Sequence, residues 1–199
     1  MVAHAYKPRL AAEKDLGYTC APIGATTMSD RPPISLYDDD PRPPPGWLLL
    51  IVLALLLIGL GATMGMLFGP DIWYQRLNKP SWNPPSWLFG PVWTLLYALM
   101  AVSMWLVRRD RRSDPELREN ATWLFVLQFG LNLCWTPLFF GLRSPMLAFL
   151  SIIALWSLLF ATVRVFWKVR VLAGAVMLPY LAWVSFALVL NGTLWWMNR

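Results

Sequence analysis

Five long apolar blocks follow one another along the chain, and the first of these blocks begins at residue 44. The blocks hold no Asp, Glu, Lys or Arg, and they cover residues 44–70, 80–107, 120–142, 144–163 and 171–198. Each block is long enough for a membrane-spanning helix of about 20 residues and much longer than a barrel strand of about ten. Because backbone groups in hydrocarbon need hydrogen bonds within their own segment, the pattern predicts an all-α membrane protein, a bundle of five transmembrane helices.

The polar stretch before the first block predicts a disordered N-terminal tail over residues 1–46, followed by a transmembrane domain over residues 47–199. The tail has several prolines between residues 32 and 45 and three consecutive aspartates at 38–40, a composition that does not support a packed core. It has no apolar run of about 7 to 15 residues, so we do not expect a secretory signal peptide. Met28 is a second candidate start of translation besides Met1.

The composition favours lipid as the solvent of the domain. Apolar residues make up 57% of the chain and charged residues 14%, against about 25% charged in soluble proteins. The net charge of +6 is scattered between the apolar blocks, which argues against a nucleic-acid partner. Thirteen basic residues lie on the N-terminal side of the five spans and four on the other side, so the positive-inside rule predicts a cytoplasmic N-terminus.

Few residues of the apolar blocks are suited to catalysis or to metal binding. The single histidine is His4, in the tail, and the two cysteines are Cys20 and Cys134, so neither a bound transition metal nor an axially ligated haem is expected. The blocks contain no carboxylate, no nucleophile beside a base and no ionisable pair that would relay protons. The sequence therefore favours a binding protein without an obligatory cofactor over an enzyme, an ion pump or a coupled transporter.

Thirteen tryptophans are an unusual number for a chain of 199 residues. Seven lie near the ends of blocks, where indole rings commonly sit at the membrane surface: Trp47, Trp87, Trp105, Trp123, Trp167, Trp195 and Trp196. Trp135 and Trp183 instead lie near the centres of their blocks, where an indole N–H must find a partner. We expect these two rings to face other helices or a ligand.

Three blocks carry polar or aromatic residues at helical spacing. These stripes are Trp93, Tyr97 and Met100 in the second block, Gln128, Asn132 and Trp135 in the third, and Trp183, Ala187, Leu190 and Asn191 in the fifth. Each stripe lies on one helix face, so the three faces could line one pocket, which would suit a flat, largely apolar ligand. The amides could equally serve as hydrogen-bonded packing between helices, worth about 0.6 kcal/mol each.

Glycine and proline residues mark places where the helices come close together or bend. Gly61, Gly65 and Gly69 recur every four residues in the first block, which suits close packing of another helix, in the same chain or in a dimer. Pro137 and Pro179 lie inside the third and fifth blocks. We expect both to kink or loosen their helices.

The connection between the first two blocks carries the most specific motif. Residues 73–85 read WYQRLNKPSWNPP and are followed by PVWTLLY at 91–97; its prolines make this connection stiff. Further along, LNLCWTPLFFG occupies residues 131–141 and LPYLAW occupies residues 178–183. In this order the motifs resemble the translocator protein family, also called tryptophan-rich sensory proteins or peripheral benzodiazepine receptors.

The resemblance implies a five-helix bundle with a pocket for porphyrins and haem, for benzodiazepine-type ligands and, in animal members, for cholesterol. The ligand-binding residues that it implies are Tyr74, Trp93, Tyr97, Asn132, Trp135, Trp183, Ala187 and Leu190. It also implies a loop that lids the pocket, with Trp73, Lys79, Pro80, Trp82, Pro84 and Pro85. Trp93 and Trp183 match the pair implicated in light-dependent porphyrin breakdown in bacterial relatives. A homodimer in contact with membrane lipid is implied as well.

The end of the last block departs from the animal pattern. Residues 191–199 read NGTLWWMNR, without the tyrosine followed by Arg or Lys that accompanies cholesterol recognition, which argues against a sterol ligand. We therefore predict a membrane protein that binds tetrapyrroles as a sensor, regulator or translocator. The alternatives are a light-dependent porphyrin-degrading enzyme and a lipid- or sterol-binding scaffold. The expected location is a bacterial envelope membrane or, in a eukaryote, the mitochondrial outer membrane or the ER and Golgi.

Overall fold

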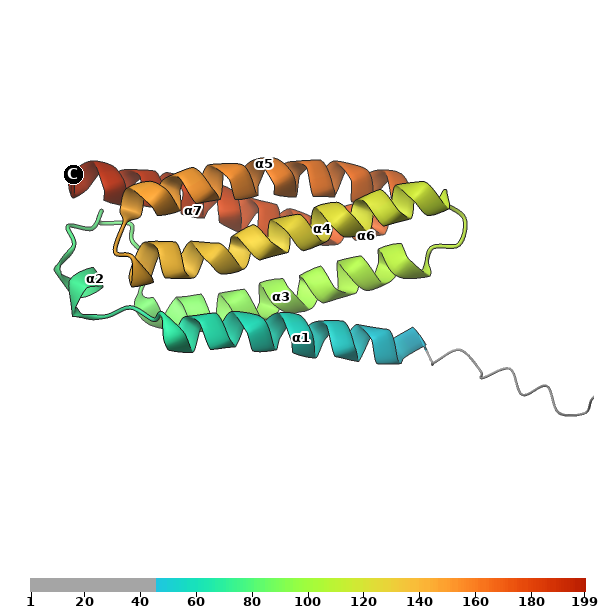
Figure 1. Ribbon diagram of the computed structural model, residues 1–199, viewed down its shortest axis with the longest axis horizontal. Coiled ribbons are helices and arrows are strands. Elements are labelled where there is room, and N and C mark those ends of the chain that lie inside the picture. The colour runs from blue at the N-terminus through green and yellow to red at the C-terminus, as the bar shows by residue number, and fades with distance from the viewer. Residues whose placement is uncertain (1–45) are drawn as a thin grey trace, which may run out of the picture. The chain divides into compact units, whose positions relative to one another are not determined.

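The computed structural model describes residues 46–199, which form helices joined by short connections (Figure 1). The helices are α1 (Gly46–Leu67), α2 (Ile72–Arg76), α3 (Ser86–Arg109), α4 (Pro115–Thr136), the π-helix η2 (Pro137–Gly141), α5 (Pro145–Val169), α6 (Val171–Val176) and α7 (Leu178–Met197). The predicted all-α fold is confirmed for this part of the chain. The predicted tail lies outside the described residues, apart from Gly46, which begins α1.

Five helical segments are long and apolar enough to cross a membrane, in agreement with the five predicted spans. α1, α3 and α5 form one span each, whereas the third span combines α4 with η2 and the fifth combines α6 with α7. The mean hydropathy of their most apolar windows ranges from 1.4 in the third span to 2.6 in the first. The chain is thus an integral membrane protein whose spans follow the apolar blocks.

Two spans begin five or more residues away from the edges of their apolar blocks. α3 begins at Ser86 and not at residue 80, because Pro85, in an extended conformation, precedes it. α4 begins at Pro115, ahead of its block, because the Asp114 side chain accepts a hydrogen bond from the Glu116 N–H and caps the helix. The charged first turns of α4 therefore extend the third span beyond its apolar part.

Pro137 and Pro179 interrupt the third and fifth spans, as predicted. Pro137 lacks the backbone N–H that would continue α4, and the chain passes into η2, where the Leu142 N–H donates to the Pro137 carbonyl at 2.8 Å. Ahead of Pro179 the fifth span breaks at Met177, between α6 and α7. Each proline thus divides one span into two helical parts.

The five spans form a ring of neighbours. α1 packs along α3 (Figure 1), α6 packs against α3, and α5 contacts both α4 and α7. α1 also contacts α4, which closes the ring. The short helix α2 lies at the end of the bundle where the C-terminus is found (Figure 1).

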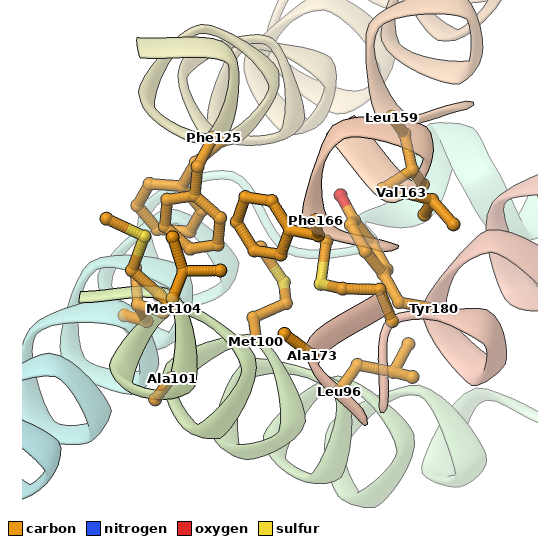
Figure 2. Packing of buried hydrophobic residues seen from close by; sticks show 14 of the residues in the cluster. Leu96, Met100, Ala101, Met104, Phe125, Leu159, Val163, Phe166, Ala173 and Tyr180 are labelled. Carbon is orange, nitrogen blue, oxygen red and sulfur yellow. The ribbon is translucent and has the colours of Figure 1, made fainter. Parts of the chain in front are cut away.

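The half of the bundle toward the α3–α4 connection has a solid core, and we call it the filled half (Figure 2). Its side chains without exposed surface include Met100, Ala101, Leu159, Phe166 and Ala173. The Phe166 ring stacks on Phe125 of α4, with centroids 6.0 Å and planes 13° apart. The Ser103 hydroxyl donates to the Ala173 carbonyl at 2.7 Å, so a hydrogen bond also joins α3 to α6.

α1 is the least buried of the spans. Leu57 is its one buried residue, whereas Leu55 and Met66 expose 69% and 80% of their surface. A helix that is apolar on all sides suits contact with lipid on its outer face. α1 therefore closes the bundle loosely, with its Gly61 against the Tyr97 ring of α3.

Candidate functional site

The half of the bundle next to α2 encloses a cavity of about 380 Å³, which we call the inner cavity. Its wall is built from α1, α3, α4 with η2, α5 and α7, and Tyr74 of α2 also contributes. The volume lies within the range of about 300 to 1,000 Å³ that is usual for small-molecule sites. The bundle is therefore filled at one end and hollow at the other, and we call this second region the hollow half.

All eight residues predicted to contact a ligand line the inner cavity. They are Tyr74 of α2, Trp93 and Tyr97 of α3, Asn132 and Trp135 of α4, and Trp183, Ala187 and Leu190 of α7. The predicted stripes of the second, third and fifth spans thus meet at one place. Gln128 and Met100 are exceptions, because both are fully buried and neither lines the cavity.

A chain of hydrogen bonds crosses the bundle between the inner cavity and the filled half. The Tyr97 hydroxyl donates to Asn132 Oδ1 at 2.9 Å, and Asn132 Nδ2 donates to the Tyr180 hydroxyl at 3.0 Å. The Tyr180 hydroxyl in turn donates to Gln128 Oε1 at 3.2 Å. Asn132 therefore fills both roles considered for the amides, because it joins three helices and also lines the cavity.

A second amide fixes the indole of Trp135. Trp135 Nε1 donates to Asn191 Oδ1 at 2.9 Å, and Asn191 Nδ2 donates to the Pro145 carbonyl at 2.9 Å. The Trp135 ring also stacks on Phe139 of η2, with centroids 5.1 Å and planes 19° apart. The central indole that was expected to need a partner has one, and its ring is held at the cavity wall.

The indoles of Trp93 and Trp183 form two further parts of the wall. The Trp93 ring stacks on Tyr97 with centroids 5.4 Å apart. The Trp183 ring lies edge-on to Phe89 at 6.2 Å and tilted against Phe186 at 5.5 Å. Aromatic rings from α3 and α7 therefore border the cavity, and such surfaces suit stacking with a flat apolar molecule.

Three glycines in α1 and just after it form another part of the wall. A side chain at Gly61 would collide with the ring of Tyr97, so the absence of one gives that ring its place. Around Gly65 no atom would meet an added Cβ, and Gly61, Gly65 and Gly69 all line the inner cavity. Of the two predicted uses of this small-residue face, Gly61 serves packing within the chain, against one aromatic side chain.

The two tryptophans predicted for the lid pack against aromatic residues of the bundle. Trp73 meets Phe139 edge-on at 5.7 Å, and Trp82 meets Phe186 edge-on at 5.9 Å. The π-helix η2, which Pro137 starts, carries Phe139 to this position below α2. The break in the third span at Pro137 therefore places Phe139 in contact with Trp73 of the α1–α3 connection.

The other predicted lid residues lie in the part of this connection that follows α2. Lys79, Pro84 and Pro85 line a second space of about 410 Å³, which we call the outer cavity. Pro80 closes a turn, because its carbonyl accepts a hydrogen bond from the Asn83 N–H at 3.0 Å. These residues lie beside the inner cavity, and their action as a lid stays a prediction.

Two polar contacts tie the α1–α3 connection to distant parts of the chain. Asp71 Oδ1 accepts from the Tyr74 N–H at 3.1 Å, and Asp71 Oδ2 pairs with Arg143 at 2.9 Å. These two contacts, the Tyr74 N–H first, hold the pKa of the Asp71 carboxyl below its ordinary value. Asn198 Oδ1 accepts from the Asn78 N–H, and Asn198 Nδ2 donates to the Asn78 carbonyl, both at 2.9 Å.

Sequence reasoning missed several residues that shape the site. Tyr180 lies three residues before Trp183 on one helix, so the helical period could have found it. Phe139 and Arg143 gave no such signal, because η2 and the turn after it bring them to α2. Arg143 has a φ of 52°, in the left-handed region that residues with side chains seldom adopt.

The inner cavity offers a ligand rings and amides but no charge. Its described lining contains no Asp, Glu, Lys, Arg or His. Within residues 46–199, no three His, Cys, Asp or Glu side chains are grouped as a metal ion would need. Burial raises the pKa of the Tyr74 phenol, which is therefore neutral at neutral pH. The arrangement offers stacking, burial and a few neutral hydrogen-bonding groups.

Comparison with known proteins agrees with the resemblance seen in the motifs. The model of the TspO/MBR family matches residues 48–197. Protein CrtK of Rhodobacter capsulatus is 41% identical, with 69% of this chain and 85% of the relative covered. Tryptophan-rich protein TspO of Chlorobaculum tepidum is 41% identical, with 65% and 82% covered. The human translocator protein is 37% identical, with 62% of this chain and 73% of the relative covered.

Proposed function

The chain belongs to the TspO/MBR family, and from that premise we propose that it binds tetrapyrroles in the inner cavity as their sensor, regulator or translocator. The observation that supports this proposal best is the inner cavity, which gathers Trp93, Trp135, Trp183 and Asn132 in one apolar site. A tetrapyrrole is a flat aromatic macrocycle, so it can stack on indole rings and bury both faces. The few amides would orient it.

Titration of protoporphyrin into the purified protein in detergent tests this proposal, with quenching of tryptophan fluorescence as the readout. Wild type should bind saturably, and Trp183→Ala should weaken binding about tenfold because a ring is lost from the wall. Trp123→Ala is the matched control, since Trp123 is 60% exposed on α4 and does not line the inner cavity. Correctly folded wild type that shows no saturable binding would contradict the proposal.

Light-dependent breakdown of the bound porphyrin is a second candidate function. Trp93 and Trp183 both line the inner cavity, so a porphyrin in that space would lie beside two oxidisable indoles. Illumination of the complex should then yield a product that forms more slowly in Trp93→Phe at equal occupancy. Photobleaching at the wild-type rate in that variant would exclude this role for Trp93.

The orientation proposed from the basic residues can be tested on intact cells. Four arginines at 108, 109, 111 and 112 follow the second span, so this end of the bundle should face the cytoplasm together with the N-terminus. In a background without native cysteines, an impermeant thiol reagent added outside should label Ser81→Cys and spare Arg111→Cys, both at exposed positions. The reverse pattern would show that the protein has the opposite orientation.

The homodimer is a separate part of the proposal. Native mass spectrometry of the purified protein would test it.

A further inference from the structure

The outer cavity adjoins the inner cavity at the α1–α3 connection. Three residues line both spaces, namely Pro70, Tyr74 and Ser86. The two cavities therefore adjoin at these residues, with Tyr74 in the wall of both. Among the described residues that line the two cavities, Lys79 is the single charged side chain, and it belongs to the outer one.

The ammonium group of Lys79 is held close to Tyr74. Lys79 Nζ donates to the Gln75 carbonyl at 3.1 Å and to the Leu77 carbonyl at 3.4 Å, and it lies 4.7 Å from the centroid of the Tyr74 ring. An ammonium group has three N–H donors, so one donor is left for a further partner. Within residues 46–199 no carboxylate forms an ion pair with Lys79.

Both ends of the segment before Lys79 are fixed to the bundle. Asp71, ahead of α2, pairs with Arg143 at 2.9 Å. Asn78, next to Lys79, exchanges two hydrogen bonds of 2.9 Å with the side chain of Asn198, near the end of the chain. A cation on such an anchored segment has a defined place, and a partner loses less freedom in meeting it than in meeting a mobile lysine.

We propose that Lys79 forms a subsite for a carboxylate of the ligand, beside the residues that the inner and outer cavities share. This inference rests on the proposed function, because protoporphyrin combines an apolar macrocycle with two propionates at one edge. A carboxylate inside the uncharged inner cavity would be left without a counter-charge, which is costly. The macrocycle therefore lies in the inner cavity, and the propionate edge points outward to Lys79.

The subsite adds selectivity to the inner cavity. Flat apolar molecules of any kind can stack on its rings, but a ligand with an acidic edge gains a charge-assisted hydrogen bond at Lys79. Neutral molecules of similar shape, including sterols and esterified porphyrins, gain nothing there. Lys79 is thus a specificity-determining residue that favours amphipathic carboxylic acids.

A comparison of protoporphyrin with its dimethyl ester tests this subsite, because the two share the macrocycle and the ester replaces both charged propionates by neutral methyl esters. Wild type should bind the acid about three- to tenfold more tightly than the ester, as a partly exposed charged hydrogen bond would allow. Lys79→Met should bind the two ligands equally, through loss of affinity for the acid alone. Lys79→Arg should restore much of the preference.

Matched variants separate this role from a structural one. Arg76→Met removes a neighbouring cation that lines neither cavity, and it should retain the wild-type preference. Lys79→Gln keeps an N–H donor for the Gln75 and Leu77 carbonyls, so it should fold even where Lys79→Met does not, and it should still lose the preference. Both variants are compared with wild type by their melting temperatures.

Three outcomes would overturn the inference. Equal binding of acid and ester by wild type would remove the subsite and leave the proposed function intact. Equal weakening of acid and ester in both Lys79→Met and Lys79→Gln would assign Lys79 to the structure of the connection. Failure of folded wild type to bind either ligand would remove the proposed function, and the subsite with it.

Discussion

The filled half and the hollow half of the bundle are built from the same kinds of residue, but they fix their aromatic rings differently. In the filled half, small residues such as Ala101 and Ala173 are completely buried, and they belong to the same core cluster as the stacked Phe125 and Phe166 rings. In the hollow half, Gly61 and Gly65 of α1 and Gly69 just after it line the inner cavity, and open space remains beside Gly65. Small residues therefore make room for neighbouring side chains in both halves, and in the hollow half a cavity remains as well.

Hydrogen bonds explain how the hollow half keeps its space. The Tyr97 hydroxyl is tied to Asn132 and the Trp135 indole to Asn191, both at 2.9 Å. A ring that turned into the cavity would break its bond and leave a buried polar group unpaired, which costs about 1 to 3 kcal/mol. The filled half should thus supply most of the stability, and the hollow half should supply the binding site.

The largest effect is expected from a truncation in the filled half. Phe166 has no exposed surface and stacks on Phe125, so Phe166→Ala should lower the free energy of unfolding by about 3 to 5 kcal/mol. Denaturant unfolding in detergent measures this loss, and the folded fraction should keep its affinity for porphyrin. Phe160→Ala on the same helix is the control, because Phe160 is 43% exposed. Equal losses in the two variants would contradict the division into halves.

A smaller effect is expected where the two halves meet. Asn132→Leu leaves the Tyr97 and Tyr180 hydroxyls each without one partner, so unfolding should become easier by about 2 kcal/mol. Thermal melting followed by circular dichroism measures the change. Asn120→Leu, at an exposed position of the same helix, should melt close to wild type. A melting temperature of Asn132→Leu equal to that of the control would show that the hydrogen-bond chain does not support the bundle.

A still smaller change in stability, combined with a clear change in binding, is expected at the glycine wall. Gly61→Ala places a methyl group where the Tyr97 ring lies, so the ring must move and its hydrogen bond to Asn132 weakens. The free energy of unfolding should fall by about 1 kcal/mol. Porphyrin affinity should fall several-fold, by about fivefold if the loss is fully expressed in binding. Gly59→Ala is the matched control, because no atom would meet its added Cβ and it does not line the cavity. Equal affinities for the two variants would count against a cavity shaped by Gly61.

The smallest effect concerns pH and the connection above the hollow half. The pKa of Asp71 lies below its ordinary value of 3.8 in the folded chain. The contacts of its carboxylate therefore stabilise the α1–α3 connection at pH above 3.8, and this stabilisation is lost as the pH falls through the lowered pKa. A fluorophore on Gln75→Cys, with the native cysteines replaced, should report this release at pH below 3.8. The same probe in Asp71→Asn should show no such transition. A transition shared by both proteins would assign it to another group.

Much of the fold could be predicted because its signals are local. The length of a block without charged residues is enough to predict a membrane span. The positions of Pro137 and Pro179 within their blocks predict where the third and fifth spans are interrupted. The gathering of Trp93, Asn132 and Trp183 around one cavity also followed from helical spacing and from the motifs that resemble a known family. Their role as ligand contacts stays a prediction.

The remaining features could not be read from the sequence because they join residues that are far apart. Asp71 meets Arg143 and Asn78 meets Asn198 only after the spans have packed. The start of α4 at Pro115 was missed for another reason, since a capping aspartate outweighs the polar character of the first turns. Local pattern therefore specifies the spans, whereas the fixing of the α1–α3 connection depends on tertiary contacts.

Filling the inner cavity tests most directly whether the hollow half is the binding site. Ala187 lines the cavity, and Ala182 lies at an exposed position of the same helix, so Ala187→Phe and Ala182→Phe form a matched pair for protoporphyrin titration in detergent. We expect Ala187→Phe to lose at least about tenfold in affinity because the ring occupies the ligand's space, with a melting temperature near that of wild type. Ala182→Phe should bind as wild type does. Undiminished binding by folded Ala187→Phe would show that the ligand lies elsewhere.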